Sequence, residues 1–375
     1  MKLRTLALIH RSIGVMLGLV LLVIGLTGST LVFYREIDQL LNSQLMQVLP
    51  QRERLSPEMA LNTVRSAFPD MKLNTIILPR TAEGIYKVGL SSNSDELIDV
   101  FVNPYSGVIL GSQQWGHTLM SFIYSIHNSL LIEEVGEQFV GICGLLLLVL
   151  VVSGLAVWPG WRKPSLGFWI RRKAPAPLLT YDLHKVGGFL SAVFLLLIAS
   201  TGAAMVFSSQ FESVTYWLTH TSKPTLPVSI AVVNQAPLRL QEILQIADTA
   251  LPEGQTTLVI LPHQPNDIFR VSKKLPQDTD VYGRSQVYID QYTGKVLQVD
   301  NALKALLPAR ISNALLSLHN GGYGGLGLRC LYVLIGLVPS ALFITGFFMW
   351  SNRNRAKYFD TLRAKATEIL KTLLP

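Results

Sequence analysis

The sequence predicts an α-helical membrane protein with α+β exterior domains, in which four transmembrane helices form two tandem repeats. Only 15% of its residues are charged, compared with about 25% in an average soluble chain. Apolar segments that meet the requirement of about 20 residues for a spanning helix lie at 12–34, 138–158, 184–207 and 329–350. Along the chain, a helix, a polar segment, a histidine-asparagine pair and another helix occur twice in the same order.

Basic residues mark one side of the membrane. They are Lys2, Arg4 and Arg11 before the first segment, Arg162, Lys163, Arg171, Arg172 and Lys173 between the second and third, and Arg353, Arg355 and Lys357 after the fourth. The positive-inside rule then predicts a bacterial inner-membrane protein with both termini in the cytoplasm and two large periplasmic segments. Topology accounts for the net charge of +8, so nucleic-acid binding is not expected. The first apolar run is too long for a cleaved signal peptide and predicts a retained anchor.

The predicted organisation follows the chain in order. It comprises transmembrane helix 1 (1–34), a first periplasmic domain (35–116), a His-Asn segment with helix 2 (117–158), a cytoplasmic link (159–183), helix 3 (184–207), a second periplasmic domain (208–308), a His-Asn segment with helix 4 (309–350) and a cytoplasmic tail (351–375).

Each periplasmic domain is predicted to pack one helix on a small antiparallel sheet. In the first, Ser56 is a preferred N-cap and Pro57 suits the first helical position, so a helix is expected through Phe68. The strand-like runs that follow lie at 73–78, 85–90, 97–102 and 108–110. The second domain repeats this order, with a helix at 238–250 and strands at 257–261, 268–271, 287–289 and 295–299.

The internal sequence repeat is clearest around the histidines. In the first and third spanning segments, LIHRSIGVMLG aligns with DLHKVGGFLSA, so His10 corresponds to His184. Before the second and fourth segments, His127-Asn128 corresponds to His319-Asn320. This pattern indicates an ancient tandem duplication whose two copies share one orientation, with a pseudo-two-fold axis along the membrane normal.

The four matching histidines are expected to form two pairs, with one histidine from each copy in each pair. His10 and His184 are predicted at the cytoplasmic surface. A single helix from His127 to the end of the second spanning segment would be about 46 Å long, which exceeds the membrane, so His127 and His319 are expected on short helices at the periplasmic surface. Because a b-type haem takes two axial imidazoles, the sequence predicts two haems b, one per pair.

A haem also needs a flat slot and cations for its propionates. Glycines that lie within about 80° of the histidine on the same helical face would line such a slot, namely Gly14, Gly28, Gly188 and Gly202. Arg11 and Lys185 directly follow their histidines and would neutralise propionates at the inner site, as would Arg310 or Arg329 at the outer one. The alternative is that these glycines serve close helix packing and that the cations reflect topology alone. Zinc or copper fits two histidines less well, and His117, His220 and His263 have no counterpart in the other copy.

These features resemble the PepSY-associated transmembrane family. The resemblance rests on HRSIGVMLGLVLLVIGLTGSTLVFYREID, the NPYSG turn, the His-Asn segments and the SGLAVW and TGFFMW helix ends. It suggests relatives among the inner-membrane ferric-siderophore reductases of the ferrioxamine-reductase type. Membership would imply four spanning helices, two periplasmic PepSY domains and haem held by His10, His184, His127 and His319. The second copy departs from the first after its His-Asn pair, where GGYGGLGLR replaces SLLIEEVGE.

The function expected from these patterns is electron transfer across the membrane. A cytoplasmic protein or a membrane quinol would supply electrons, and a ferric siderophore in the periplasm would accept them and release Fe(II). Two other classes stay open. One is a non-enzymatic PepSY membrane sensor or protease modulator, and the other is a metal or siderophore permease that uses the histidines as a relay.

Overall fold

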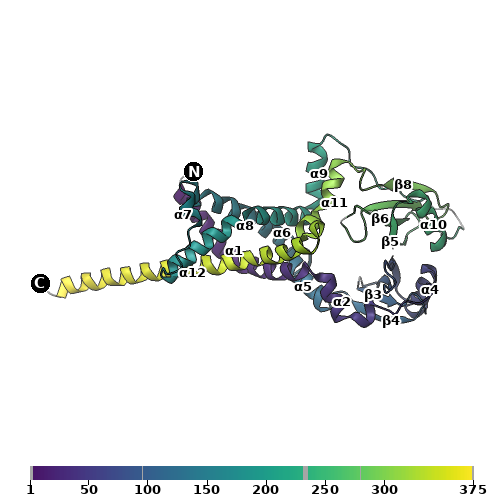
Figure 1. Cartoon of the computed structure of the whole chain (residues 1–375), viewed down its shortest axis with the longest axis horizontal. Helices are drawn as coiled ribbons and strands as arrows, with labels where there is room; N and C mark the ends of the chain where they lie inside the picture. Colours follow the sequence, from purple (N-terminus) through teal and green to yellow (C-terminus); the bar gives the residue numbers. More distant parts are fainter. Residues whose placement is uncertain (1–2, 95, 231–234, 279, 374–375) are drawn as a thin grey trace. The chain divides into compact units, whose positions relative to one another are not determined.

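The computed structural model describes residues 3–94, 96–230, 235–278 and 280–373. The chain divides into two compact units, whose helices and strands are labelled in Figure 1. The membrane unit comprises Met1–Val32, Tyr124–Phe207 and Leu318–Pro375, and the sheet unit comprises Phe33–Ile123 and Ser208–Ser317. Each unit therefore draws on both copies of the repeat.

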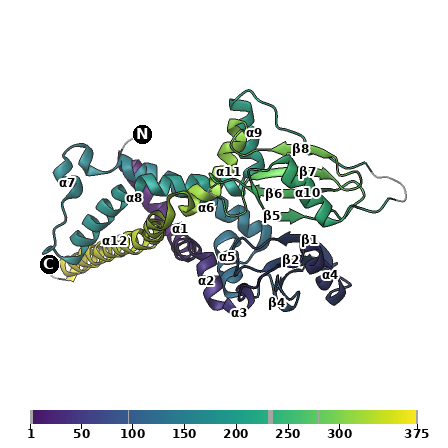
Figure 2. The ribbon, with the colours of Figure 1, turned by 45° about the vertical axis from the view of Figure 1, so that its right-hand side comes forward.

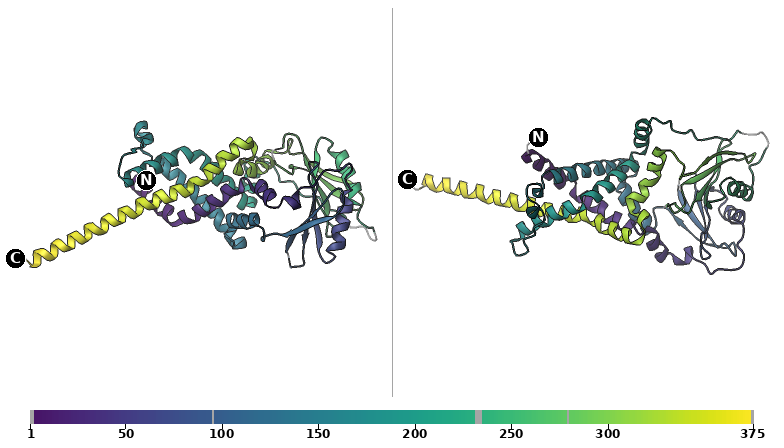
Figure 3. Two further views of the ribbon diagram at one scale, coloured as in Figure 1. Left: turned by 60° about the horizontal axis from the view of Figure 1, so that its bottom comes forward. Right: turned by 45° about the horizontal axis from the view of Figure 1, so that its top comes forward.

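Four helices of the described chain are long and apolar enough to cross a membrane, as the sequence predicts. They belong to α1 (Leu3–Leu31), α6 (Glu133–Ala156), α8 (Ala176–Val206) and α12 (Gly325–Leu373). Helix α1 packs on α12 and α6, and α8 packs on α6 and α12. In both views of Figure 3, α12 continues past the other spanning helices. Several helices extend beyond the apolar segments predicted from the sequence. The polar residues that flank an apolar segment can continue the helix, although they do not contribute to its hydropathy.

Small residues allow α1 and α12 to approach closely. A Cβ atom on Gly25 would lie 2.5 Å from the carbonyl oxygen of Gly336, and one on Gly336 would lie 2.4 Å from Ser29 Oγ. The Ser29 hydroxyl also donates to the carbonyl oxygen of Val333 at 3.0 Å. This contact joins the two copies, and at Gly25 the glycine serves helix packing.

Shorter helices and turns occur in both units. The predicted helices that carry the His-Asn pairs are α5 (Leu119–Ser129) and α11 (Leu307–Asn320). The link contains the 3-10 turn η1 (Pro159–Trp161) and α7 (Pro164–Phe168), and the turn η2 (Gly322–Gly324) precedes α12. Three further helices are not predicted from the sequence, because they are too short to show a clear apolar period. They are α2 (Tyr34–Leu41), α3 (Ser43–Met46) and α9 (Ser208–Leu218).

In the sheet unit, each copy contributes one helix followed by four strands, in the order that the sequence predicts. The first copy gives α4 (Pro57–Ala67), β1 (Lys72–Ile77), β2 (Tyr86–Ser91), β3 (Leu97–Val102) and β4 (Ile109–Gln114). The second gives α10 (Leu240–Ala250), β5 (Gln255–Ile260), β6 (Ile268–Lys274), β7 (Ser285–Asp290) and β8 (Val296–Asp300). Ser56 caps α4 by accepting a hydrogen bond from the backbone N–H of Met59, as expected for this residue. Gly107 and Gly294 both have φ +71° in the turns before β4 and β8, a conformation that favours glycine.

The two sets of strands form one continuous antiparallel sheet in the order β4-β3-β2-β1-β5-β6-β7-β8. The copies meet where β1 pairs with β5, with Ile76 opposite Val259, and Figure 2 shows these strands as neighbours. One hydrophobic core includes buried residues of α4, of α10 and of strands from both copies. Glu58 of α4 also accepts a hydrogen bond from the backbone N–H of Leu240 in α10 at 2.7 Å. The two predicted domains are thus joined through backbone pairing and a shared core.

We predict that Ile76→Ala destabilises both halves of the sheet together. Ile76 is fully buried at the β1–β5 junction, and truncation of a buried isoleucine costs about 2–5 kcal/mol. Hydrogen exchange of the purified protein should show faster exchange in β5–β8 as well as in β1–β4. Leu97→Ala, at a half-exposed side chain of β3, serves as the control and should leave both halves protected. Loss of protection confined to β1–β4 would contradict a shared core.

Candidate functional site

The four matching histidines lie in two pairs within the membrane unit. The ring centroids of His10 and His184 are 6.2 Å apart, with an angle of 87° between the ring planes. The centroids of His127 and His319 are 6.1 Å apart, with an angle of 56°. Each pair combines one histidine from each copy. The structure therefore brings together the residues that the repeat associates by sequence.

In the inner pair, both imidazoles are anchored through Nδ1. His10 Nδ1 lies 3.0 Å from the carbonyl oxygen of Leu150 and 3.0 Å from Ser153 Oγ on α6. His184 Nδ1 lies 2.9 Å from Thr345 Oγ1 on α12. The partner helix in each case belongs to the same copy as the histidine.

The outer pair repeats this arrangement. His127 Nδ1 lies 3.0 Å from the carbonyl oxygen of Ile24 and 3.3 Å from Thr27 Oγ1 on α1. His319 Nδ1 lies 3.0 Å from the carbonyl oxygen of Ile198 on α8. The hydroxyl of Thr201 lies 3.1 Å from the same nitrogen. Because a backbone carbonyl only accepts hydrogen bonds, Nδ1 carries the proton in the rings of His10, His127 and His319, and Nε2 is left with its lone pair for a metal.

A glycine follows each of these hydroxyl residues and lets the imidazole approach the helix. A Cβ atom would lie 2.7 Å from His127 Cε1 if built on Gly28, and 2.9 Å from His319 Cε1 if built on Gly202. A Cβ atom would lie 3.1 Å from His10 Cε1 if built on Gly154, and 3.4 Å from His184 Cε1 if built on Gly346. Every histidine therefore packs on a Ser-Gly or Thr-Gly pair of a spanning helix. Gly28 and Gly202, which the sequence analysis assigns to a haem slot, lie directly beneath the outer imidazoles.

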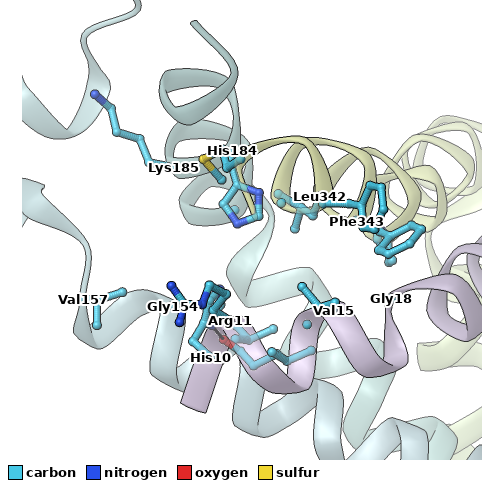
Figure 4. Close-up of a pocket in the computed structure, with 18 of the residues that line it drawn as sticks. His10, Arg11, Val15, Gly18, Gly154, Val157, His184, Lys185, Leu342 and Phe343 are labelled. Atoms are coloured by element: carbon cyan, nitrogen blue, oxygen red, sulfur yellow. Dashed lines mark hydrogen bonds between the residues drawn. The ribbon is translucent and has the colours of Figure 1, made fainter. Parts of the chain in front are cut away.

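The inner pair borders a cavity of about 350 Å³. Figure 4 shows His10 and His184 on opposite walls, on α1 and α8. Gly14 and Gly188 also line it, and a Cβ atom on either would be in ordinary contact, at 3.8 Å from its nearest neighbour. Gly18 lines the cavity as well, but there the ring of Phe343 fills the space, at 1.9 Å from a hypothetical Cβ.

The residues present fit a haem held by two imidazoles. Metal–imidazole bonds of about 2.0–2.1 Å, as found for zinc, separate the ring centroids of two axial ligands by about 6 Å. Both histidine pairs have this separation. The anchored Nδ1 atoms and the glycine-lined walls of the inner cavity meet the two further requirements, a fixed ligand nitrogen and a surface that a flat macrocycle can approach.

The basic residues predicted to neutralise haem propionates differ in their surroundings. Arg11 and Lys185 both line the inner cavity. However, Lys185 Nζ forms an ion pair with Asp182 Oδ1 at 2.7 Å, and the Asp182 side chain is fully buried. Arg171 of the link binds the same carboxylate twice, through Nε at 2.8 Å and Nη2 at 2.9 Å. The sequence analysis does not select Asp182, although an acid at the start of a spanning helix is a signal of function or pairing.

At the outer end, Arg329 donates through Nη2 to the carbonyl oxygen of Val32 at 2.6 Å, whereas Arg310 of α11 is exposed. The unmatched histidines lie elsewhere, in the sheet unit. His117 lines a polar cavity of about 430 Å³ together with Asp38, whose pKa is raised by burial. His220 and His263 lie in loops of that unit.

We predict that Gly28→Ala and Gly202→Ala destabilise the protein, whereas Gly187→Ala does not. The first two would force a methyl group against an imidazole at under 3 Å, and such overpacking costs about 1–3 kcal/mol. Gly187 has nothing within 4 Å of its Cβ position, so alanine there should be neutral or stabilise by up to about 1 kcal/mol. Thermal unfolding of the detergent-solubilised variants measures the difference. Equal stability of all three would refute the close contact.

We also predict that Asp182→Ala lowers stability by about 3 kcal/mol, because it leaves the nearly buried Lys185 ammonium without its counter-ion. The matched control is Glu212→Ala, which removes an ion pair with the exposed Lys223 and should cost about 1 kcal/mol or less. The same thermal assay compares them. If both changes have equal effects, the buried cluster does not stabilise the link.

Taken together, the apolar helices, the antiparallel sheet with its packed helices and the paired imidazoles define a membrane protein with an α+β domain. The family model for the PepSY-associated TM region matches residues 7–353. The chain therefore belongs to this family. Among curated proteins, none matches the chain.

Proposed function

We propose that this protein is a haem-containing inner-membrane reductase that passes electrons across the membrane to a ferric siderophore in the periplasm. The observation that carries the proposal is the presence of two histidine pairs with centroid separations of 6.2 and 6.1 Å. Each pair draws on both copies, so a ligand shared between two imidazoles explains why all four histidines recur at matching positions. A haem at each pair would supply one-electron redox chemistry, and the iron of the chelate, once reduced, would be released from the siderophore as Fe(II).

The residues of this chain would fix the ligand nitrogens and tune them. His10 and His184 would hold the inner haem, and His127 and His319 the outer one. A polar group on a neighbouring helix would orient each ring, and the carbonyl oxygens that accept from Nδ1–H of His10, His127 and His319 would raise the basicity of Nε2, which stabilises an oxidised metal. Because every imidazole is held by a helix of its own copy, separation of the copies would pull the two ligands apart.

The spacing along α1 supports a path across the whole bilayer. His10 lies on α1, and His127 packs on Gly28 of the same helix. At 1.5 Å per residue, these positions are about 27 Å apart, close to the thickness of the hydrocarbon core of about 30 Å. The two pairs therefore suit opposite surfaces of one membrane.

The flanking charges support the direction of transfer. Basic residues border the ends of the spanning helices near the inner pair, which favours a cytoplasmic location for both termini and for the link. The donor would be a separate cytoplasmic protein or a membrane quinol, and the acceptor would reach the outer pair from the periplasm.

We predict that His184→Ala and His10→Ala each remove about one haem equivalent, and that the double variant removes no more than either single one. His319→Ala should remove the other equivalent, because it belongs to the second pair. A pyridine-haemochrome assay of the purified protein counts the haem, and the Soret and α bands report the ligand set. His263→Gln, in a loop of the sheet unit, is the control and should keep the full haem content.

The same preparation separates this function from its alternatives. A sensor or protease modulator would be purified without haem even after expression with ample haem supply. A permease would accumulate the chelate in sealed vesicles without any reductant, whereas a reductase should release Fe(II) to a trapping chelator only when an electron donor is present. Colourless protein would overturn the proposal.

A further inference from the structure

Trp158 stands out among the residues that line the inner cavity. Its side chain is 8% exposed, and its indole stacks on the ring of Phe189 with centroids 3.8 Å apart. Within the described part of the chain, its Nε1–H is buried and has no hydrogen-bond partner. A buried donor without a partner costs about 1–3 kcal/mol, so such a group is retained where something accepts its hydrogen bond.

The indole is packed on two sides. The link approaches its benzene ring, since Cβ atoms on Gly160 and Gly167 would lie 2.0 Å from Cη2 and 2.3 Å from Cζ2. Phe189 covers one face of the ring. Trp158 is also among the residues that line the inner cavity, so the unpaired Nε1–H belongs to a side chain that borders the space for a ligand.

Two arginines add positive charge to the same cavity. Arg11 and Arg353 both line it, from α1 and α12 respectively. Lys185 lines it too, but Asp182 already neutralises its ammonium. The rest of the lining is mostly apolar and aromatic, including Phe343 and Trp350. An apolar cavity with guanidinium groups and an unpaired N–H donor suits an amphipathic ligand that carries carboxylates.

We propose that Trp158 Nε1 and Arg353 bind the carboxylates of the inner ligand, which are the propionates of the haem if the proposed function holds. Arg11, which the sequence predicts as a propionate-binding residue, completes the site. Lys185 instead forms an ion pair with the buried carboxylate of Asp182. Trp158 and Arg353 are positioning residues, because they contact the periphery of the ligand and not its metal. Their hydrogen bonds fix the rotation of the macrocycle between His10 and His184.

The test compares haem with its dimethyl ester, which keeps the macrocycle but lacks free carboxylates. The His127→Ala/His319→Ala background leaves the inner pair as the binding site, and the Soret band follows titration of the apoprotein. We expect the background to bind haem at least tenfold more tightly than the ester. Trp158→Phe and Arg353→Gln should each weaken haem binding about tenfold and leave ester binding unchanged, because each removes one hydrogen bond to a charged carboxylate.

Two matched variants serve as controls. Trp161→Phe changes an indole that touches Trp158 but donates its Nε1–H to the carbonyl oxygen of Leu155, and Arg355→Gln changes a neighbouring exposed arginine. Neither should alter the preference for haem. In the unmodified chain, Trp158→Phe should also shift the midpoint potential of one haem and leave the other unchanged.

The outcomes separate this inference from the proposed function. If the background binds haem and ester equally and Trp158→Phe changes nothing, the carboxylate site is refuted while the haem-binding function stands. If neither compound binds to the background or to the unmodified chain, the proposed function fails and this inference fails with it. If the background does not fold, the test uses the single variant Trp158→Phe with all four histidines present. Its two midpoint potentials are compared with those of the unmodified chain, and the carboxylate site is refuted if neither potential changes.

Discussion

The structure of the membrane unit depends on one repeated interaction, the hydrogen bond between a histidine Nδ1 and a backbone carbonyl of a neighbouring helix. His10, His127 and His319 each form this bond, and His184 Nδ1 lies against the Thr345 hydroxyl instead. In all four cases the imidazole packs on a glycine that directly follows a hydroxyl residue. The glycine provides room for the ring and the carbonyl sets its tautomer, so local helix geometry determines which nitrogen keeps its lone pair. The chemistry of the site is thus encoded in residues that contribute almost no side-chain volume.

Both halves of the chain contribute to each unit, and within each unit different contacts hold the halves together. In the membrane unit, glycines allow α1 of the first copy to pack on α12 of the second. In the sheet unit, backbone pairing of β1 with β5 and a shared core perform this role. Neither copy is a separate body in either unit, since each relies on the other to cover its apolar surface and to complete a histidine pair.

Much of this arrangement is predictable because it follows local rules. Hydropathy locates the spanning helices, strand and turn patterns locate β1–β8, and the alignment of His10 with His184 identifies the pairs. The β1–β5 pairing is not predictable, because alternating strands have no local signature for the edge they pair with. The anchoring hydroxyls of Ser153 and Thr345 are present in the SGLAVW and TGFFMW motifs, but only the fold reveals that a histidine lies against them. Asp182 is missed for the same reason, since its partner Arg171 lies in an irregular link.

The continuous sheet restricts how the two copies can move. Transporters built from repeats alternate access largely by rocking one repeat against the other around a central site. Here such rocking would shear the backbone hydrogen bonds between Thr75–Ile77 and Leu258–Ile260 and would expose the core beneath them. The paired strands connect the two halves of the chain, which suits a rigid scaffold better than a carrier that must open and close.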